Sequence, residues 1–563
     1  MSILGRLAGG LFVVSLLLVA RPAAADKVCT KSCKNLQENC VGAARATFGA
    51  EKPACTDKTC KRAAKKRFKT RSVECRAVRK ACKPCCDLGG VNECAEAKGA
   101  VIAAQPQVGG DPVHGRELLL SGDYMTCGIP LKVYDSVPGL IAGGFGGPAD
   151  APRIPDRAGR NADLPFFLNT FTAPDGAEVV NANCLMCHGG TFDGQLIVGL
   201  GNATADFTAG AGGGITGVPI TDDLVDLLGL TEIERAQLQK IASRGGALGP
   251  LTKMRTIGMN PAELFAVILM VHHDRDTLAW SDVPLTPLVP VDHDGAPIAD
   301  PRVTSDPPPW WRAHKKHALF YNGMARGDHR GTMALATSVC VDDVARAQVV
   351  DEEFKDIQAF ISAMRAPTYT RSIDAALVDQ GRVTFARDCA GCHGSYAASD
   401  DEESYPNLII PLDVIGTDPV VAEAGVVHSP ELVSWYNGSF YGGITQMVPN
   451  DPFPGYMPPP LDGIWATAPF FHNGSVPTVE LVLNSHARPT YWARTDLDST
   501  NFDEAAMGWP YVVHDGPPDA LPPAERKMVF DTTQWSQSNA GHTYGDHLTD
   551  AERRAVIEYL KTL

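Results

Sequence analysis

Apolar positions along the chain form one long run near the start, a few helical stripes, and long stretches without a regular period. The apolar run at 7–20 follows Arg6 and precedes three alanines at 23–25, which is the pattern of a secretory signal peptide. We therefore assign residues 1–25 to a signal peptide and expect a periplasmic or secreted protein. No later apolar stretch is long enough to span a bilayer, so the sequence predicts no transmembrane anchor.

The clearest helical stripes lie near the end of each half of the chain. Residues 549–552 form a capping box ahead of an apolar stripe over 555–563, and a similar stripe covers 356–364. A third helix is expected over the apolar stretch 264–271, which follows the capping segment 260–263.

The segments between these helices are rich in glycine and proline. The chain has 54 glycines and 42 prolines, many of them in runs such as 210–214, 306–309 and 457–460. Such runs are typical of irregular backbone, and little of the alternation that marks strands is present. We therefore expect a mainly α fold with long irregular loops.

The pattern C-x-x-C-H occurs twice, with Cys184, Cys187 and His188 in the first copy and Cys389, Cys392 and His393 in the second. On a helical turn the two thiols share a face, so both can form thioethers with one porphyrin. The histidine that follows then lies under the ring as the proximal iron ligand. The sequence therefore predicts two covalently bound haem c groups. A zinc site or a redox disulfide is the alternative. A zinc site would need the two pairs, 205 residues apart, or further Cys/His ligands to be brought together. A thioredoxin-like motif would not require a histidine after both pairs.

The remaining cysteines fall into two even groups, as disulfides in an oxidising compartment require. Of 16 cysteines in all, ten lie between Cys29 and Cys94, and two stand alone at Cys127 and Cys340. A disulfide between Cys127 and Cys340 would cross-link the first haem domain.

Charge separates residues 26–98 from the rest of the chain. This segment has 18 Lys/Arg against 8 Asp/Glu, although the formal net charge of the whole chain is −15. The helical spacing of its cysteines predicts two helices, over 28–48 and 58–82, in a disulfide-linked hairpin. This basic module could contact an acidic cell envelope or the acidic haem body, or could be a stabilising appendage. Export argues against nucleic-acid binding.

The haem body has features of an internal duplication, which predicts haem c domains over 105–370 and 371–563. A glycine lies eight residues before the first cysteine of each motif, at Gly176 and Gly381. The closing helices carry an aromatic residue at equivalent positions, Phe360 and Tyr559. We expect the helix ahead of each motif to pack against the closing helix of the same half.

Longer signatures carry a family resemblance over residues 105–563. They stand at 183–188, 198–202, 310–316, 323–328, 415–419, 460–477 and 539–545. In these segments the chain resembles the diheme cytochromes related to rubber oxygenases (RoxA-like), which are relatives of bacterial diheme cytochrome c peroxidases and MauG-like enzymes. This haem body is shorter than a rubber oxygenase, and the basic module has no counterpart there. The resemblance implies the fold and haem binding, but it does not imply polyisoprene cleavage.

The second axial ligand decides what each haem can do, because an iron with two protein ligands cannot readily bind oxygen or peroxide. For the second haem the resemblance points to His542 opposite His393, as the ligands of an electron-transfer centre. Met457 and His472 are the competing candidates.

For the first haem no equivalent partner stands out, and we predict that this haem, on His188, is the reactive one. The segment 310–330 mixes aromatic and donor side chains, and from it we select Phe320 and Arg326 as distal candidates. We expect an oxidoreductase that activates O2 or peroxide and exchanges electrons with a redox protein or a small-molecule donor. An electron carrier with both irons closed by protein ligands is the alternative.

Overall fold

The computed structural model describes residues 98–211, 220–397 and 399–563, together with isolated residues between 41 and 95. The chain divides into two compact units, Met1–Gly90 and Val91–Leu563. The predicted signal peptide and most of the basic module lie outside the described residues. In the described part of the chain, no helix combines the length and the apolar character needed to cross a bilayer.

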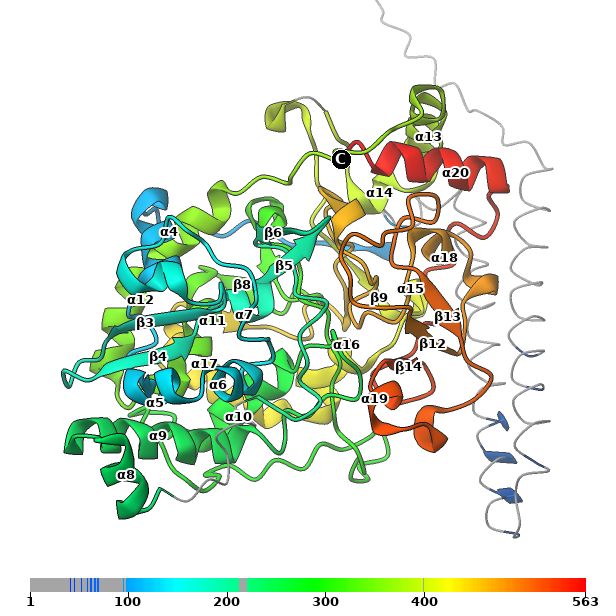
Figure 1. Cartoon of the computed structure of the whole chain (residues 1–563). Helices are drawn as coiled ribbons and strands as arrows, with labels where there is room; N and C mark the ends of the chain where they lie inside the picture. Colours follow the sequence, from blue (N-terminus) through cyan, green and yellow to red (C-terminus); the bar gives the residue numbers. More distant parts are fainter. Residues whose placement is uncertain are drawn as a thin grey trace, which may run out of the picture. The chain divides into compact units, whose positions relative to one another are not determined.

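The prediction of a mainly α fold is wrong, because the structure is 41% helical and 13% strand and has a mixed α/β fold with several small sheets (Figure 1). The helices are α4 (Pro112–Ser121), α5 (Leu131–Ser136), α6 (Pro138–Gly144), α7 (Leu185–His188), α8 (Asp222–Leu228), α9 (Glu232–Leu248), α10 (Ala262–His272), α11 (Arg330–Leu335), α12 (Val344–Ala363), α13 (Ala375–Asp388), α14 (Ala390–His393), α15 (Leu412–Ile415), α16 (Val420–Glu423), α17 (Pro430–Gly438), α18 (Val479–Leu483), α19 (Pro523–Arg526) and α20 (Asp550–Leu560).

The strands are two to five residues long, and all their pairings are antiparallel. The sheets have the strand orders β1-β9-β11, β7-β8-β10, β13-β12-β14, β2-β4-β3 and β5-β6. The strands are β1 (Ala100–Val101), β2 (Ile129–Pro130), β3 (Leu168–Thr172), β4 (Glu178–Ala182), β5 (Gly189–Phe192), β6 (Gln195–Val198), β7 (Ala318–Leu319), β8 (Ala325–Gly327), β9 (Leu408–Pro411), β10 (Thr445–Met447), β11 (Gly455–Tyr456), β12 (Tyr491–Arg494), β13 (Tyr511–Val513) and β14 (Val529–Asp531).

The segment before the first haem motif is a β-hairpin, not the helix that the duplication predicted. Strands β3 and β4 pair from Leu168↔Ala182 to Thr172↔Glu178, and the turn between them contains Gly176 with a φ of +92°. This conformation suits glycine and follows a Pro-Asp pair, which is a turn signature. Gly176 is therefore a turn residue, and it is not equivalent to Gly381.

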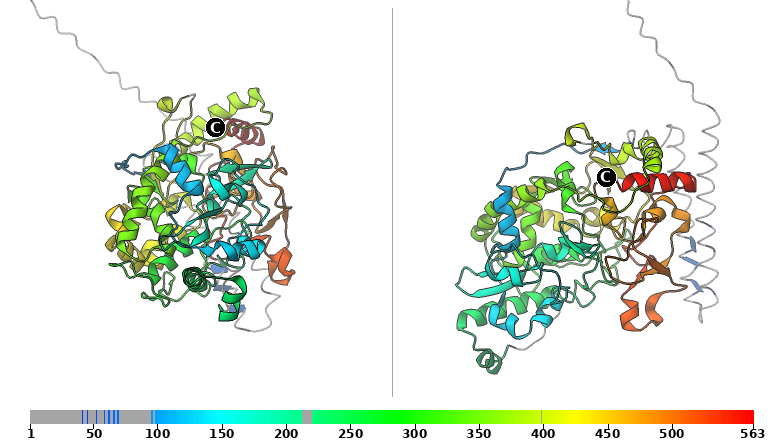
Figure 2. Two further views of the ribbon diagram at one scale, coloured as in Figure 1. Left: turned by 60° about the vertical axis from the view of Figure 1, so that its left-hand side comes forward. Right: turned by 45° about the horizontal axis from the view of Figure 1, so that its top comes forward.

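Two helix pairs nevertheless repeat the same packing. Helix α13 lies beside α20 in Figures 1 and 2, and α4 packs against α12. A Cβ added at Gly381 of α13 would lie 1.9 Å from the carbonyl oxygen of Ala555, and one added at Gly115 of α4 would lie 1.9 Å from that of Asp356. The expected packing of a helix ahead of the motif against the closing helix holds in the second half. In the first half α4 takes this place, and the hairpin separates it from the motif.

We expect Gly381→Ala to lower the free energy of unfolding by about 1–3 kcal/mol, because the new methyl group overlaps the backbone of α20. Gly139→Ala is the matched control, since Gly139 is also a helix glycine but an added Cβ there meets no heavy atom within 4 Å. Urea unfolding of the two purified variants measures the difference. Equal effects of the two substitutions would show that the close approach of α13 and α20 is not needed for stability.

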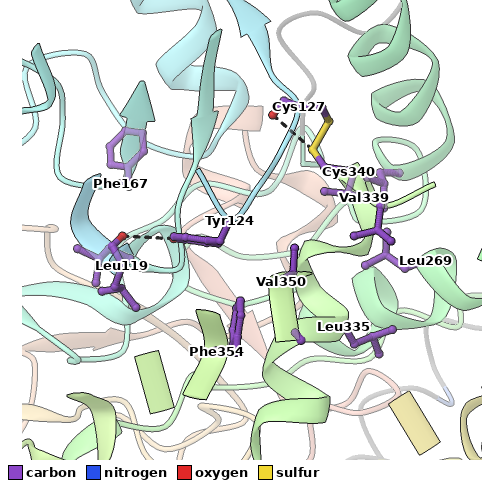
Figure 3. Close-up of a cluster of buried hydrophobic side chains, with 14 of the residues drawn as sticks. Leu119, Tyr124, Cys127, Phe167, Leu269, Leu335, Val339, Cys340, Val350 and Phe354 are labelled. Carbon is purple, nitrogen blue, oxygen red and sulfur yellow. Dashed lines mark hydrogen bonds between the residues drawn. A yellow bond between two sulfur atoms is a disulfide. The ribbon is translucent and has the colours of Figure 1, made fainter. Parts of the chain in front are cut away.

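A disulfide fastens the largest apolar core. The sulfurs of Cys127 and Cys340 are bonded across a sequence separation of 213 residues, which confirms the predicted pairing (Figure 3). Both residues are buried in the same cluster as Tyr124, whose hydroxyl donates to the carbonyl oxygen of Leu119 at 3.3 Å. The cluster joins α4, α12 and the β3–β4 hairpin into one core around the first haem motif.

Candidate haem site

Each C-x-x-C-H motif folds as one helical turn. The amide of His188 donates to the carbonyl oxygen of Cys184 at 3.1 Å, and that of His393 donates to Cys389 at 3.0 Å. Among the described cysteines, the free thiols are those of the two motifs: Cys184, Cys187, Cys389 and Cys392. The expected local geometry, with two thiols and a histidine on one short turn, is therefore present in α7 and α14.

The two motif histidines are held in the same way. The Nδ1 atom of His188 lies 3.2 Å from the carbonyl oxygen of Pro308, and Nδ1 of His393 lies 2.8 Å from that of Pro459. A carbonyl can only accept, so Nδ1 carries the proton and Nε2 keeps a lone pair for a metal. Burial lowers the pKa of both histidines to about 4, so each imidazole is neutral.

Sequence reasoning missed the role of these prolines. Pro308 and Pro459 are the middle residues of two triplets, 307–309 and 458–460, that were interpreted only as irregular backbone. A proline carries no amide proton, so within each triplet the backbone offers acceptors and no donors. The occurrence of a triplet once for each C-x-x-C-H motif was the signal that could have identified them.

Both motifs line one cavity with a volume of about 420 Å³. Its walls are mainly apolar and include Ala262, Ala266, Leu319, Phe320, Met333, Ile361, Phe385, Leu461, Ile464, Phe470, Phe471, Val479 and Leu560. Apolar walls with a few convergent polar groups are typical of a cofactor site.

The ring of His542 faces that of His393 in this cavity. The two ring centres are 6.3 Å apart, and the ring planes are inclined by 57°. His542 has a φ of +44°, its amide donates to the carbonyl oxygen of Ile415 at 2.8 Å, and its own carbonyl oxygen accepts from Arg488 at 3.1 Å. Burial lowers the pKa of His542 to about 3, so this imidazole is also neutral.

The two competing ligand candidates have other contacts. The side chain of Met457 packs in a cluster with Ile102, and its sulfur would lie 2.8 Å from a Cβ added at Gly323. The ring of His472 stacks on Tyr456 with centres 4.3 Å apart, and its Nε2 atom lies 3.1 Å from the Tyr456 hydroxyl.

The surroundings of the first motif differ from those of the second. The ring of His188 stacks on Trp310 at 4.9 Å, and no histidine ring contact to His188 is present among the described residues. Phe320 lines the cavity with a φ of +65°. Arg326 lies in β8, outside the cavity lining, and its Nη1 is 3.9 Å from a carboxylate oxygen of Asp451.

Five charged residues in the cavity wall do not belong to the site residues selected from the sequence: Glu263, Asp306, Arg312, Lys316 and Asp388. Burial raises the pKa of Glu263 to about 7 and lowers that of Lys316 to about 8. Within the described ranges, no three His, Cys, Asp or Glu side chains gather as a metal-binding cluster.

The residues present fit a haem, because the donor set is the one that haem c requires. The cavity has paired thiols for thioethers, neutral imidazoles for iron and apolar walls for the porphyrin. It also has a buried cation, Arg312, whose Nη2 atom has no hydrogen-bond partner in the protein.

Comparison with known proteins supports this interpretation for part of the chain. Residues 455–493 match the family described as "RoxA-like, cytochrome c-like". Two uncharacterised proteins of Sinorhizobium fredii are similar: y4iJ is 29% identical over 34% of this chain, and y4iM is 24% identical over 46%. The matched regions span 39% and 64% of those two proteins. The chain therefore contains a cytochrome c-like domain, which indicates haem binding and redox function.

Proposed function

We propose that the chain is an exported diheme c-type cytochrome that acts as an oxidoreductase. One haem c is attached through Cys184 and Cys187 with His188 as its proximal ligand, and it reacts with O2 or peroxide. The second haem c is attached at the motif of His393 and exchanges electrons with a redox protein or a small-molecule donor.

The contrast between the two motif histidines carries this proposal. A metal–imidazole bond is about 2.0 Å, and the ring centre lies about 1.1 Å beyond the nitrogen, so two axial imidazoles place their ring centres about 6.2 Å apart. The rings of His393 and His542 are separated by 6.3 Å, which fits two ligands on one iron. His188 has no facing histidine ring among the described residues, so the first haem would be held by His188 as its one histidine ligand.

When bound, haem supplies one-electron chemistry and, where a face is open, a binding position for an oxygen species. The carbonyl oxygens of Pro308 and Pro459 hold the two imidazoles in one tautomer, and this hydrogen bond increases the basicity of the coordinating nitrogen. Phe320 and its apolar neighbours give the shared cavity an apolar lining. Glu263 lines the same wall with a pKa near 7, so its carboxyl can hold or release a proton at neutral pH.

Optical and EPR spectra of the purified protein, with and without carbon monoxide, test the proposal. We expect two haems per chain, one that binds carbon monoxide when reduced and one low-spin haem that does not. Two low-spin haems that ignore carbon monoxide and peroxide in every redox state would favour the electron carrier. A single haem per chain would contradict the diheme assignment.

A further inference from the structure

Two cations in the cavity wall, Arg312 and Lys316, form no ion pair with a carboxylate among the described residues. The side chain of Arg312 is buried, with 5% of the residue exposed, and its Nε donates to the backbone carbonyl oxygen of Asp462 at 2.9 Å. Its Nη2 atom is buried without a hydrogen-bond partner. Within the described residues, no ion pair joins Arg312 or Lys316 to an Asp or Glu side chain.

The neighbouring Lys315 shows that the same short segment can satisfy a cation when the protein provides carboxylates. Its Nζ atom forms ion pairs with Glu403 and, at 2.6 Å, with Asp462. Lys315 does not line the cavity, whereas Arg312 and Lys316 do. The two unpaired cations are therefore the ones that face the cavity.

Arg312 and Lys316 also lie between the two haem motifs. They belong to the segment that starts with the 3₁₀ helix Trp310–Lys315, whose first residue stacks on His188. At the other side, Arg312 lines the same cavity as Cys392 and His393 of the second motif.

An isolated buried cation is strongly unfavourable unless an anion or several acceptors compensate it. The cavity wall also contains the carboxyl groups of Asp306 and Glu263, but burial raises the pKa of both and so favours their neutral forms. In a cavity that holds haem, the propionate carboxylates of the porphyrin are further anions. A planar guanidinium and an ammonium group are both suited to bind carboxylates.

We propose that Arg312 and Lys316 bind haem propionates and form one cationic clamp at the junction of the two haem sites. This inference rests on the proposed function, because it requires haem in the cavity. The clamp neutralises carboxylate charge close to iron and so favours the reduced state.

Redox titration of the holoprotein, followed by optical spectroscopy, tests the clamp. We expect Lys316→Gln to shift the equilibrium between ferric and ferrous iron about tenfold toward the ferric state for at least one haem, which equals a potential 59 mV lower. Arg312→Gln should act in the same direction. Lys316→Arg keeps the charge and should restore the potential.

Lys240→Gln is the control for loss of one positive charge away from the cavity. Lys240 lies on α9, outside the cavity lining, and pairs with Asp342. The propionate bending band in the resonance Raman spectrum gives a second readout, and it should change in Lys316→Gln but not in Lys240→Gln. Should Arg312→Gln fail to fold, Lys316→Gln alone decides the result.

The possible results separate the two proposals. Unchanged potentials and an unchanged propionate band in a Lys316→Gln protein with two haems would overturn the clamp and leave the proposed function intact. Equal shifts in the Lys316→Gln and Lys240→Gln variants would also overturn it, since the effect would then be one of net charge. A wild-type protein without haem would instead overturn the proposed function itself.

Discussion

Replacing His542 with alanine is expected to turn a closed haem into an open one. The ring of His542 lies opposite His393 at the separation that two axial imidazoles require. Without it, the iron on His393 keeps a single protein ligand, so the low-spin EPR signal of this haem should disappear. Carbon monoxide binding to the reduced protein should rise from one to two equivalents per chain, as measured by optical titration.

The two other ligand candidates provide matched controls for this substitution. Met457→Leu removes the thioether but keeps an apolar side chain in the cluster with Ile102. His472→Phe removes an imidazole and keeps an aromatic ring against Tyr456. Both variants should retain the low-spin signal. Loss of that signal in either of them, with no change in His542→Ala, would transfer the ligand role to the other residue.

His188→Ala should remove the reaction with peroxide or O2. The first haem would lose its proximal ligand, which is the neutral imidazole held by Pro308. Among the described residues, no other histidine ring contacts His188, so no neighbouring histidine can take its place. We expect peroxide reduction with an artificial electron donor to fall at least about a thousandfold, which corresponds to about 4 kcal/mol of barrier. Steady-state kinetics and the carbon monoxide difference spectrum measure this loss.

His486→Ala is the control for this variant, because that histidine has a 42% exposed side chain and lies outside the cavity lining. It should keep the full rate. A His188→Ala protein that still reduces peroxide at the rate of the unmodified chain would show that the haem on His393 is the reactive one.

The chemistry of the motifs could be predicted from the sequence because it depends on local spacing. Two thiols and a histidine within five residues need only one helical turn, and such a turn is present in α7 and in α14. The arrangement of the His542 ring opposite the His393 ring could not be predicted from local spacing. It joins residues far apart in the sequence, and only the family resemblance pointed to it.

The fold class was missed because the strands are too short to show an alternating pattern. The β3–β4 hairpin carried a usable signal in the Pro-Asp-Gly turn that ends at Gly176, and the β5–β6 hairpin carried another in Asp193-Gly194. Matching Gly176 to Gly381 by its distance from the cysteine concealed the first signal. The structural counterpart of Gly381 is Gly115, which lies within α4 and approaches the equivalent carbonyl of α12.

The charged residues of the cavity wall could not be predicted because their burial is a tertiary property. Lys315 and Lys316 are adjacent and chemically identical, yet one pairs with carboxylates outside the cavity and the other faces into it. The proline carbonyls present the same difficulty, since Pro308 and Pro459 reach their histidines over more than sixty residues of chain.

The disulfide between Cys127 and Cys340 sets a condition on biosynthesis. The loop that it closes contains Cys184 and Cys187, whose thiols are free. If haem is attached there, as proposed, a newly made chain must oxidise one pair of cysteines while another pair inside the same loop stays reduced. A thiolate near a disulfide can attack it and rearrange the pairing. Burial raises the pKa of Cys187 to about 11, which keeps this thiol protonated and slows such exchange. Burial in the folded core therefore disfavours attack by the Cys187 thiol on the Cys127–Cys340 disulfide.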